Sequence, residues 1–288
     1  MSRCLAALAS AFCLAACSVP GTVQARAFTT GFKVGQTIRY NVHTTVTGSL
    51  SIGGQQLPLN SDQTLAEKLE VKSVDGAGNA TIDVIAEDRI DAATGGGATL
   101  KPAPVRLVIG SDGRIRSGAT AQPGGRVPSI PGSDQLTPIL PGKAVKPGDS
   151  WDRRYDRLNP YGPGGFSFTS HNRYLKDEAV GDRQAAVIES TVGGPIDFTI
   201  DFSKLPNPAA KPPSVPAQSP VHYTGAISST TRYWVDLSSN EVLKASGSGT
   251  YTLAYSVAPA AGQASGPQQV NFNGRIKTDL TRLQPVAP

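Results

Sequence analysis

The feature that most constrains the fold of this chain is a strict alternation of apolar and polar residues in several long runs. In residues 196–202, isoleucine and phenylalanine alternate with aspartate and threonine, and residues 38–43 show the same period. A period of two places one set of side chains on a buried strand face and the other set in solvent. The alternation therefore predicts a mainly antiparallel, all-β fold with little helix.

The C-terminal third contains the longest pair of such runs. One face of the first run carries Ile227, Thr231, Tyr233, Val235 and Leu237, and one face of the second carries Leu243, Ala245, Tyr251, Leu253, Tyr255 and Val257. Between them, Ser238-Ser239-Asn240 has the residue types that favour tight turns. We expect a long hairpin here. Similar turn sequences at residues 75–79, 111–113 and 180–182 predict further hairpins.

Residues 65–71 fit two kinds of secondary structure. Asp62 could cap a helix in which Leu65 and Leu69 have helical spacing, but Leu65, Leu69 and Val71 also share one face of a strand. Because this run leads directly into the turn at residues 75–79, we predict a strand.

A weak internal repeat links the two halves of the chain. Residues 69–87 and 105–118 have the order hairpin, gap, hairpin, and residues 173–191 and 231–247 repeat it. The similarity is one of pattern more than identity. It fits either a duplication or the general resemblance between β meanders.

Proline-rich segments interrupt the strand runs. The chain has 31 glycines and 23 prolines, a composition that favours turns over long helices. Residues 122–148 form a Pro/Gly-rich connection between the halves, and residues 205–220 form a second proline-rich loop. Such segments do not lie in the middle of a sheet. Exposed linker is the preferred interpretation, with a ligand flap or a partner contact as the alternative.

The N-terminus has the three parts of an export signal. Arg3 is followed by an apolar run that is too short to span a bilayer, and Pro20-Gly21 ends it. Leu14-Ala15-Ala16-Cys17 resembles the lipobox of bacterial lipoproteins. The resemblance implies a signal peptide over residues 1–16, acylation of Cys17 and anchoring in the cell envelope, at the outer membrane where there are two.

A second cleavage site lies after Ala25, in the small-x-small sequence Val23-Gln24-Ala25. Its use would leave a soluble periplasmic or secreted protein and discard every cysteine of the chain, since Cys4, Cys13 and Cys17 all precede it. We expect Cys4 and Cys13 to be apolar signal residues under either route. The expected organisation is a signal peptide (1–16, or 1–25), a tether (17–32), a first β half (33–121), the connection (122–148) and a second β half (149–284).

The charge pattern does not favour nucleic acid as a partner. The formal net charge is +5, and Arg153, Arg154 and Arg157 are interleaved with Asp152 and Asp156. Such a stretch reads as solvated and self-paired, and no basic and aromatic stripe accompanies it.

The sequence carries no pattern typical of a catalytic or metal site. His43, His171 and His222 are far apart and lack the spacing of zinc ligands. Ser248 lies in a Gly-Ser-Gly sequence without the spacing of a hydrolase nucleophile. The carboxylates Asp83, Glu87, Asp88 and Asp91 could be drawn together into an acid-base pair, but Asp83, Glu87 and Asp91 look like strand or turn positions that face outward. We therefore expect a protein without cofactor or metal that is not an enzyme.

The stretch Pro147-Gly148-Asp149-Ser150-Trp151 resembles a Pro-Gly-(Asp/Glu)-x-Trp turn of envelope β proteins, in which the tryptophan starts a strand. Pro147 and Gly148 suit the turn, and a large ring at Trp151 suits burial. We predict that Trp151 is a structural anchor for the second half.

These features predict a curled sheet, half-barrel or sandwich built from two hairpin-rich halves. The layout is similar to that of the periplasmic lipid and lipoprotein carriers of the LolA type, although the chain lacks the amphipathic helices that plug those half-barrels. The resemblance implies a lipid or another apolar molecule as ligand. Residues expected to face such a ligand, or else to form a core, are Phe198, Phe202, Tyr233, Tyr251 and Tyr255.

Two functions remain open from the sequence. The first is binding of an apolar ligand at the envelope, where the small residues Ala245, Gly247 and Gly249 would leave room for it or merely allow the sheet to curve. The second is a structural or interaction module in which the same aromatic residues form a dry core, since alternating aromatics are more often core than cavity wall. An envelope protein would then be the partner.

Overall fold

The structure is a computed structural model that describes residues 24–89, 104–118, 137–158, 165–201, 220–257 and 268–283. Within these ranges it contains strands and turns but no helix. The strands are β1 (Thr37–Ile52), β2 (Gln55–Val74), β3 (Ala80–Arg89), β4 (Val105–Ile109), β5 (Ile115–Gly118), β6 (Ser150–Leu158), β7 (Gly165–Val180), β8 (Arg183–Ile200), β9 (Val221–Asp236), β10 (Val242–Val257) and β11 (Gln268–Arg282).

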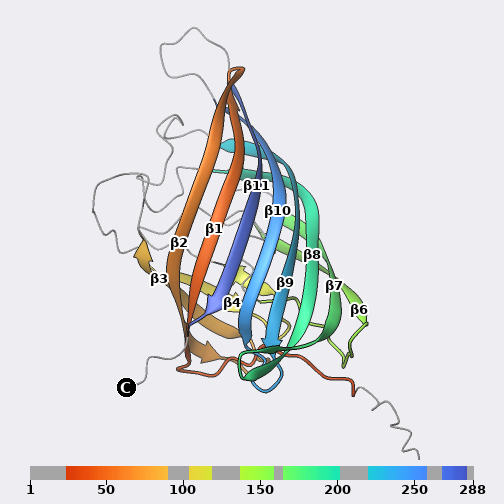
Figure 1. The fold of residues 1–288 in the computed structure, drawn as a ribbon. Helices are drawn as coiled ribbons and strands as arrows, with labels where there is room; N and C mark the ends of the chain where they lie inside the picture. Colours follow the sequence, from red (N-terminus) through yellow and green to blue (C-terminus); the bar gives the residue numbers. More distant parts are fainter. Residues whose placement is uncertain are drawn as a thin grey trace, which may run out of the picture.

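All of these strands belong to one antiparallel sheet with the order β5-β4-β3-β2-β1-β11-β10-β9-β8-β7-β6. The first and second β halves of the chain are joined through the pairing of β1 with β11. The sheet is strongly curled (Figure 1), and no ladder between described residues joins its edge strands β5 and β6. The prediction of an all-β, curled antiparallel sheet is confirmed.

Residues 65–71, whose sequence fits both a helix and a strand, lie within the strand β2. Leu65 and Leu69 lie opposite Val42 and Ile38 of β1, so the apolar residues of both strands share one face. The predicted turns are also confirmed, because residues 75–79, 111–113, 180–182 and 238–240 each connect two paired strands. Asn240 adopts a positive φ of 59°, which an asparagine tolerates better than most residues.

One end of the curl encloses the main hydrophobic core, and we call this end the proximal end. The core brings together residues from both edges of the sheet, including Leu107 and Ile109 of β4, Trp151 of β6 and Tyr174 of β7. Ile38 of β1 and Tyr233 of β9 belong to the same core. The two β halves therefore share a single core, and the face that carries it is the inner face of the curled sheet.

Two segments outside the sheet complete the proximal core. Phe28 packs edge-on against Tyr174 with ring centroids 5.4 Å apart, although residues 17–32 are expected to form a tether. Ile139, Leu140 and Val145 are buried, although residues 122–148 are expected to be an exposed linker. Arg26 and Val145 exchange backbone hydrogen bonds of 2.7 and 2.8 Å. The two segments thus pack on the core beside the turn between β4 and β5 and the start of β6.

Trp151 lies in this core beside the buried connection. Its ring is buried, and its Nε1 donates a hydrogen bond of 2.9 Å to the carbonyl oxygen of Ile139. A buried tryptophan needs such a partner, since an unpaired indole N–H is costly. The tryptophan therefore links the start of β6 to the segment that closes the core.

Candidate ligand-binding wall

The inner face continues beyond the proximal core to the other end of the sheet, which we call the distal end. Because side chains alternate along each strand, residues in phase with the core positions Tyr40, Ile188, Tyr233, Ala245 and Leu280 face the same way. We call the apolar members of this set at the distal end the distal wall. They are Val46, Leu50, Ile52, Leu57, Leu59, Phe168, Val192, Ile196, Phe198, Ile200, Val221, Tyr223, Ile227, Tyr251, Leu253, Tyr255, Val270, Phe272 and Ile276.

A strip of aromatic side chains crosses the distal wall near the end that lies farthest from the proximal core. Phe198 of β8 lies opposite Tyr223 of β9, and Tyr223 lies opposite Tyr255 of β10. The rings of Phe198 and Tyr223 are stacked with centroids 5.1 Å apart, and those of Tyr223 and Tyr255 are 4.8 Å apart. Burial, and to a smaller extent the charge of the nearby Tyr255, raises the pKa of Tyr223 to about 12. The strip is therefore a largely dry surface.

Glycines on the inner face are covered by neighbouring side chains. Phe168 lies over Gly194, with Cδ1 3.1 Å from the place that a Cβ would take, and Phe272 lies over Gly274, with Cζ at 2.6 Å. A Cβ at Gly247 would overlap the side chain of Thr231. Of the two roles open for Gly247, the structure favours close packing in a curved sheet over room for a ligand.

Exposure of the distal wall increases from β8 towards β2. Ile196 and Tyr251 are 2% and 3% exposed, whereas Leu59 and Leu57 are 38% and 49% exposed. The difference accompanies a change in the ladder, since among the described residues β3 pairs with β2 from Leu65 onwards. The distal half of β2 thus has no described partner from β3. The apolar face is continuous from a buried region to an exposed one.

A polar belt separates the distal wall from the proximal core. Ser170 donates a hydrogen bond of 2.8 Å to Asn172 and lies 3.3 Å from the hydroxyl of Ser190, and all three side chains are buried. Asn172 in turn donates to the carbonyl oxygen of Trp151 at 3.3 Å. These groups satisfy one another, so the belt marks an inner boundary of the apolar wall.

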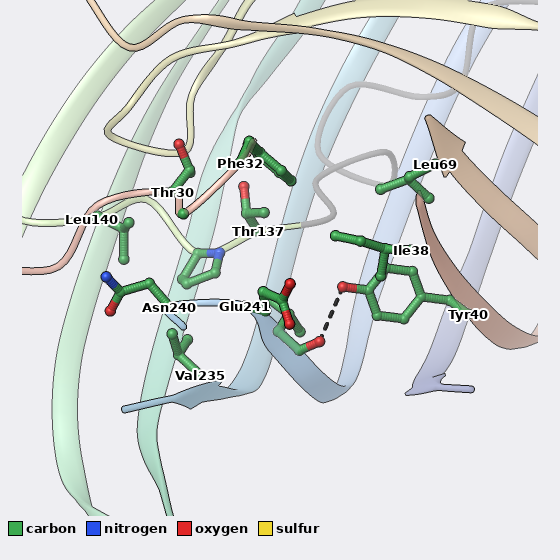
Figure 2. A pocket seen from close by; sticks show the side chains of 13 residues that line it. Thr30, Phe32, Ile38, Tyr40, Leu69, Thr137, Leu140, Val235, Asn240 and Glu241 are labelled. Atoms are coloured by element: carbon green, nitrogen blue, oxygen red, sulfur yellow. Dashed lines mark hydrogen bonds between the residues drawn. The ribbon is translucent and has the colours of Figure 1, made fainter. Parts of the chain in front are cut away.

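A small pocket lies at the proximal end, between the segment at residues 30–32 and the start of β1 (Figure 2). The cavity volume of this pocket is about 20 Å³, which is enough for one or two water molecules and too little for a lipid. Ile38, Leu69 and Val235 line it beside Glu241. We therefore place the candidate site on the distal wall and not in this pocket.

The polar groups of the pocket are occupied by structural contacts. The Tyr40 hydroxyl donates a hydrogen bond of 3.0 Å to the carbonyl oxygen of Val242, and burial raises the Tyr40 pKa well above its usual value. The Glu241 carboxylate accepts hydrogen bonds from both Gln36 and Arg282. These contacts join β1, β10 and β11 at the proximal end.

The structure separates the aromatic residues that the sequence grouped together. Phe198, Tyr251 and Tyr255 lie on the distal wall, whereas Tyr233 is part of the proximal core. Phe202 and Cys17 lie outside the described residues.

Several wall residues were not identified from the sequence. Among them are Tyr223, Phe272, Leu57 and Leu59. The alternation of Val221, Tyr223, Gly225 and Ile227 could have revealed Tyr223, but Gly225 interrupts the apolar run. At Leu57 and Leu59 the intervening Pro58 reads as a turn.

The histidines have ordinary polar partners, as do Asp83 and Glu87 among the grouped carboxylates, and Asp91 lies outside the described residues. His43 lies 2.7 Å from Asp62, His171 lies 2.9 Å from Asp152, and all four side chains are exposed. Asp83 accepts two hydrogen bonds, of 2.7 and 2.9 Å, from Arg106. These bonds, against a smaller opposing effect of burial, hold the pKa of Asp83 below its usual value. The Asp83 carboxylate thus pairs with an arginine and not with a second carboxylate.

The described ranges contain neither a cluster of metal ligands nor a helix that could span a membrane. No group of three or more His, Cys, Asp or Glu side chains in them is arranged to hold a metal ion. No helix in them is long and apolar enough to cross a membrane.

Comparison with known proteins identified no relative of this chain. No protein-family model matches the sequence, and no curated protein matches it closely enough to indicate a shared family.

Proposed function

We propose that the protein binds the hydrocarbon part of a lipid, or a similarly apolar molecule, on the distal wall and does not act on it chemically. The observation that carries the proposal is the continuity of the wall. The same apolar face runs from the buried Tyr251 and Ile196 to the exposed Leu57 and Leu59. An apolar surface that continues into solvent at one edge offers both a contact area and an entry.

The size of the effect follows from hydrocarbon burial. Each methylene group removed from water contributes about 0.8 kcal/mol, so a chain needs about ten or more of them on the wall to bind at micromolar concentration. The wall spans β2, β1, β11, β10, β9, β8 and β7, and all of its members are aliphatic or aromatic. Selectivity for chain length over head group is the expected result, because the polar belt satisfies its own hydrogen bonds.

We further propose that the protein is exported and lipid-anchored through Cys17. The support is the lipobox-like sequence Leu14-Ala15-Ala16-Cys17 behind a short apolar run. Two acyl chains anchor a protein stably, whereas a single chain binds only marginally. Changing Cys17 to Ser should move the protein out of the membrane fraction. If the Cys17→Ser protein stays membrane-bound and its normal counterpart starts at Arg26, the anchor is excluded.

Titration with a long-chain fatty acid tests the binding proposal. Leu253 belongs to the wall, and a carboxylate there would have to be desolvated by a bound chain, so Leu253→Asp should weaken binding at least about tenfold. Thr250→Asp is the matched control, since Thr250 lies on the outer face of the same strand and is exposed. Equal affinities for the two variants and the parent protein would contradict the proposal.

A second function is favoured by the tight contacts between aromatic rings and glycines on the inner face. Phe168 over Gly194 and Phe272 over Gly274 pack as they would in a closed core. In that case the protein is a structural or interaction module of the envelope. It would then bind no fatty acid at any concentration below that at which the acid forms micelles.

A further inference from the structure

Charged residues are unevenly distributed between the two ends of the sheet. Residues 44–61 and residues 245–274 contain no Asp, Glu, Lys or Arg. The proximal half, by contrast, carries ion pairs on its outer face, among them Arg39 with Glu87 at 3.0 Å and Lys68 with Glu70 at 2.8 Å. The distal ends of β1, β2, β10 and β11 therefore form an uncharged end of these four strands, whereas β8 carries Asp197 near its distal end.

The hairpin of β1 and β2 ends at this uncharged end. It turns at Gly53 and Gly54, whose φ angles of 57° and 86° favour glycine. Figure 1 shows this turn at the end of the sheet opposite the segment that precedes β1. We call residues 48–60 the distal tip. Leu57 lies opposite Leu50 across the hairpin, so both leucines are on one face.

The distal tip exposes aliphatic side chains and contains no charged residue of its own. Leu57 and Leu59 are among the few large apolar residues that are exposed in the described chain. The other residues of the tip are serine, glutamine, glycine, asparagine and proline, besides Leu50 and Ile52. Such a tip can leave water without desolvating a charge, which is the most costly step in entering an apolar phase.

We propose that the distal tip docks on a lipid bilayer, with Leu57, Leu59 and the neighbouring Leu50 entering the interfacial region. A bilayer fits better than a protein partner, because stable protein interfaces bury about 800 Å² on each side and depend on Tyr, Trp or Arg anchors. Residues 48–60 contain none of these three residue types. Docking does not require ligand binding, although Leu50, Leu57 and Leu59 also belong to the wall, and docking would place its open edge beside a source of lipid.

Fluorescent labels at the two ends of β2 test this proposal. An environment-sensitive dye is attached to the exported, mature protein through Gln56→Cys in the tip or through Ser73→Cys, an exposed position at the proximal end of the same strand. Phosphatidylcholine vesicles are added at high ionic strength, which screens electrostatic attraction. Emission from position 56 should shift to the blue and resist an aqueous quencher, and emission from position 73 should not change.

A charge variant and its control complete the test. Leu57→Asp with Leu59→Asp should lower partition into vesicles at least about tenfold. Val34→Asp, at a 66% exposed apolar position outside the tip, should leave it unchanged. If the emission from position 56 does not change when vesicles are added, the proposal is overturned. It is also overturned if that emission shifts with protein concentration in the absence of vesicles, because a second copy of the protein then covers the tip.

Fatty-acid titration without vesicles separates the two proposals. Leu57 and Leu59 are themselves members of the wall, so this titration uses the parent protein. If labels report no docking while the parent protein binds fatty acid, only the docking inference is lost. If the tip docks and no fatty acid binds, only the proposed ligand binding is lost.

Discussion

Phe198 and Tyr223 face each other on neighbouring strands, with their ring planes only 14° from parallel and their centroids 5.1 Å apart. Tyr255 on the next strand extends the pair into a strip across β8, β9 and β10. Flat aromatic surfaces of this kind give hydrocarbon chains a large contact area at little cost in side-chain entropy. The strip is thus the part of the distal wall that a ligand should use most.

Two substitutions within this strip should distinguish the contribution of ring contact to ligand affinity from that of the tyrosine hydroxyl. Phe198→Ala removes the ring that stacks on Tyr223 and should weaken fatty-acid binding about fivefold to tenfold, a loss of about 1 kcal/mol. Tyr223→Phe keeps the ring and should leave binding within about twofold. Fluorescence titration of both variants measures the two affinities. A larger loss for Tyr223→Phe than for Phe198→Ala would mean that polar contacts hold the ligand.

Trp151→Phe should reduce the free energy of unfolding by about 1–3 kcal/mol. The change removes the donor to the buried carbonyl oxygen of Ile139 and leaves that oxygen unpaired. Trp234→Phe is the control, because the Trp234 indole donates to the side chain of Glu178 at 3.3 Å in a partly exposed place. Urea unfolding compares the two variants. Equal losses would show that the Trp151 hydrogen bond is not what ties the connection to β6.

Gly225→Ala should destabilise the protein by at least about 2 kcal/mol. A Cβ at this position would overlap the carbonyl oxygen of Thr252 on β10, and the φ of 159° lies at the limit of what other residues adopt. Gly76→Ala is the matched control, since nothing lies within 4 Å of the added atom. Thermal unfolding of both variants checks the prediction, which fails if Gly225→Ala melts at the temperature of the parent protein.

Acid should destabilise the protein through Asp83 and Asp236. Hydrogen bonds from Arg106 lower the pKa of Asp83. Burial favours a higher pKa for Asp236, but hydrogen bonds from Ser238 and Ser239 and the charge of Arg183 outweigh it, so this pKa is also lowered. A lowered pKa stabilises the fold above the unfolded value of about 4, and this contribution is lost as the pH falls below it.

Unfolding in urea at neutral pH and below pH 4 measures this dependence. Asp83→Asn and Asp236→Asn should each be less stable than the parent at neutral pH, and the differences should shrink in acid. Thr250→Asp adds an exposed carboxylate without a buried partner and should show the pH dependence of the parent. An Asp83→Asn protein with the full acid sensitivity of the parent would assign that sensitivity to other groups.

The fold was largely predictable from the sequence because alternation is a local property. Residues 38–43 and 196–202 point to strands whatever surrounds them, and both are strands in β1 and β8. The burial of Ile139, Leu140 and Val145 could not be predicted in this way. A Pro/Gly-rich segment has no periodicity, and these residues are buried because they pack on a core formed by strands that are distant from them in the sequence.

The candidate site was predictable only in part, for a similar reason. Tyr233 and Tyr251 occupy equivalent positions in the alternation of β9 and β10, yet one lies in the proximal core and the other on the distal wall. The sequence does not record how far along each strand the curl encloses a core. The duplication suggested by the repeated order of hairpins likewise stays a prediction, since a plain meander has the same order.

The most direct test of ligand binding is a native mass spectrum of the mature protein purified from the membrane fraction of a bacterium that expresses it with its own leader. Our account predicts a discrete adduct with the mass of a lipid or fatty acid, which is absent under denaturing conditions and depleted in the Leu253→Asp variant. Covalent acyl chains would survive denaturation and are thereby distinguished from a bound ligand. A folded parent protein that carries no adduct, and that gains none when fatty acid is added, would contradict the central claim.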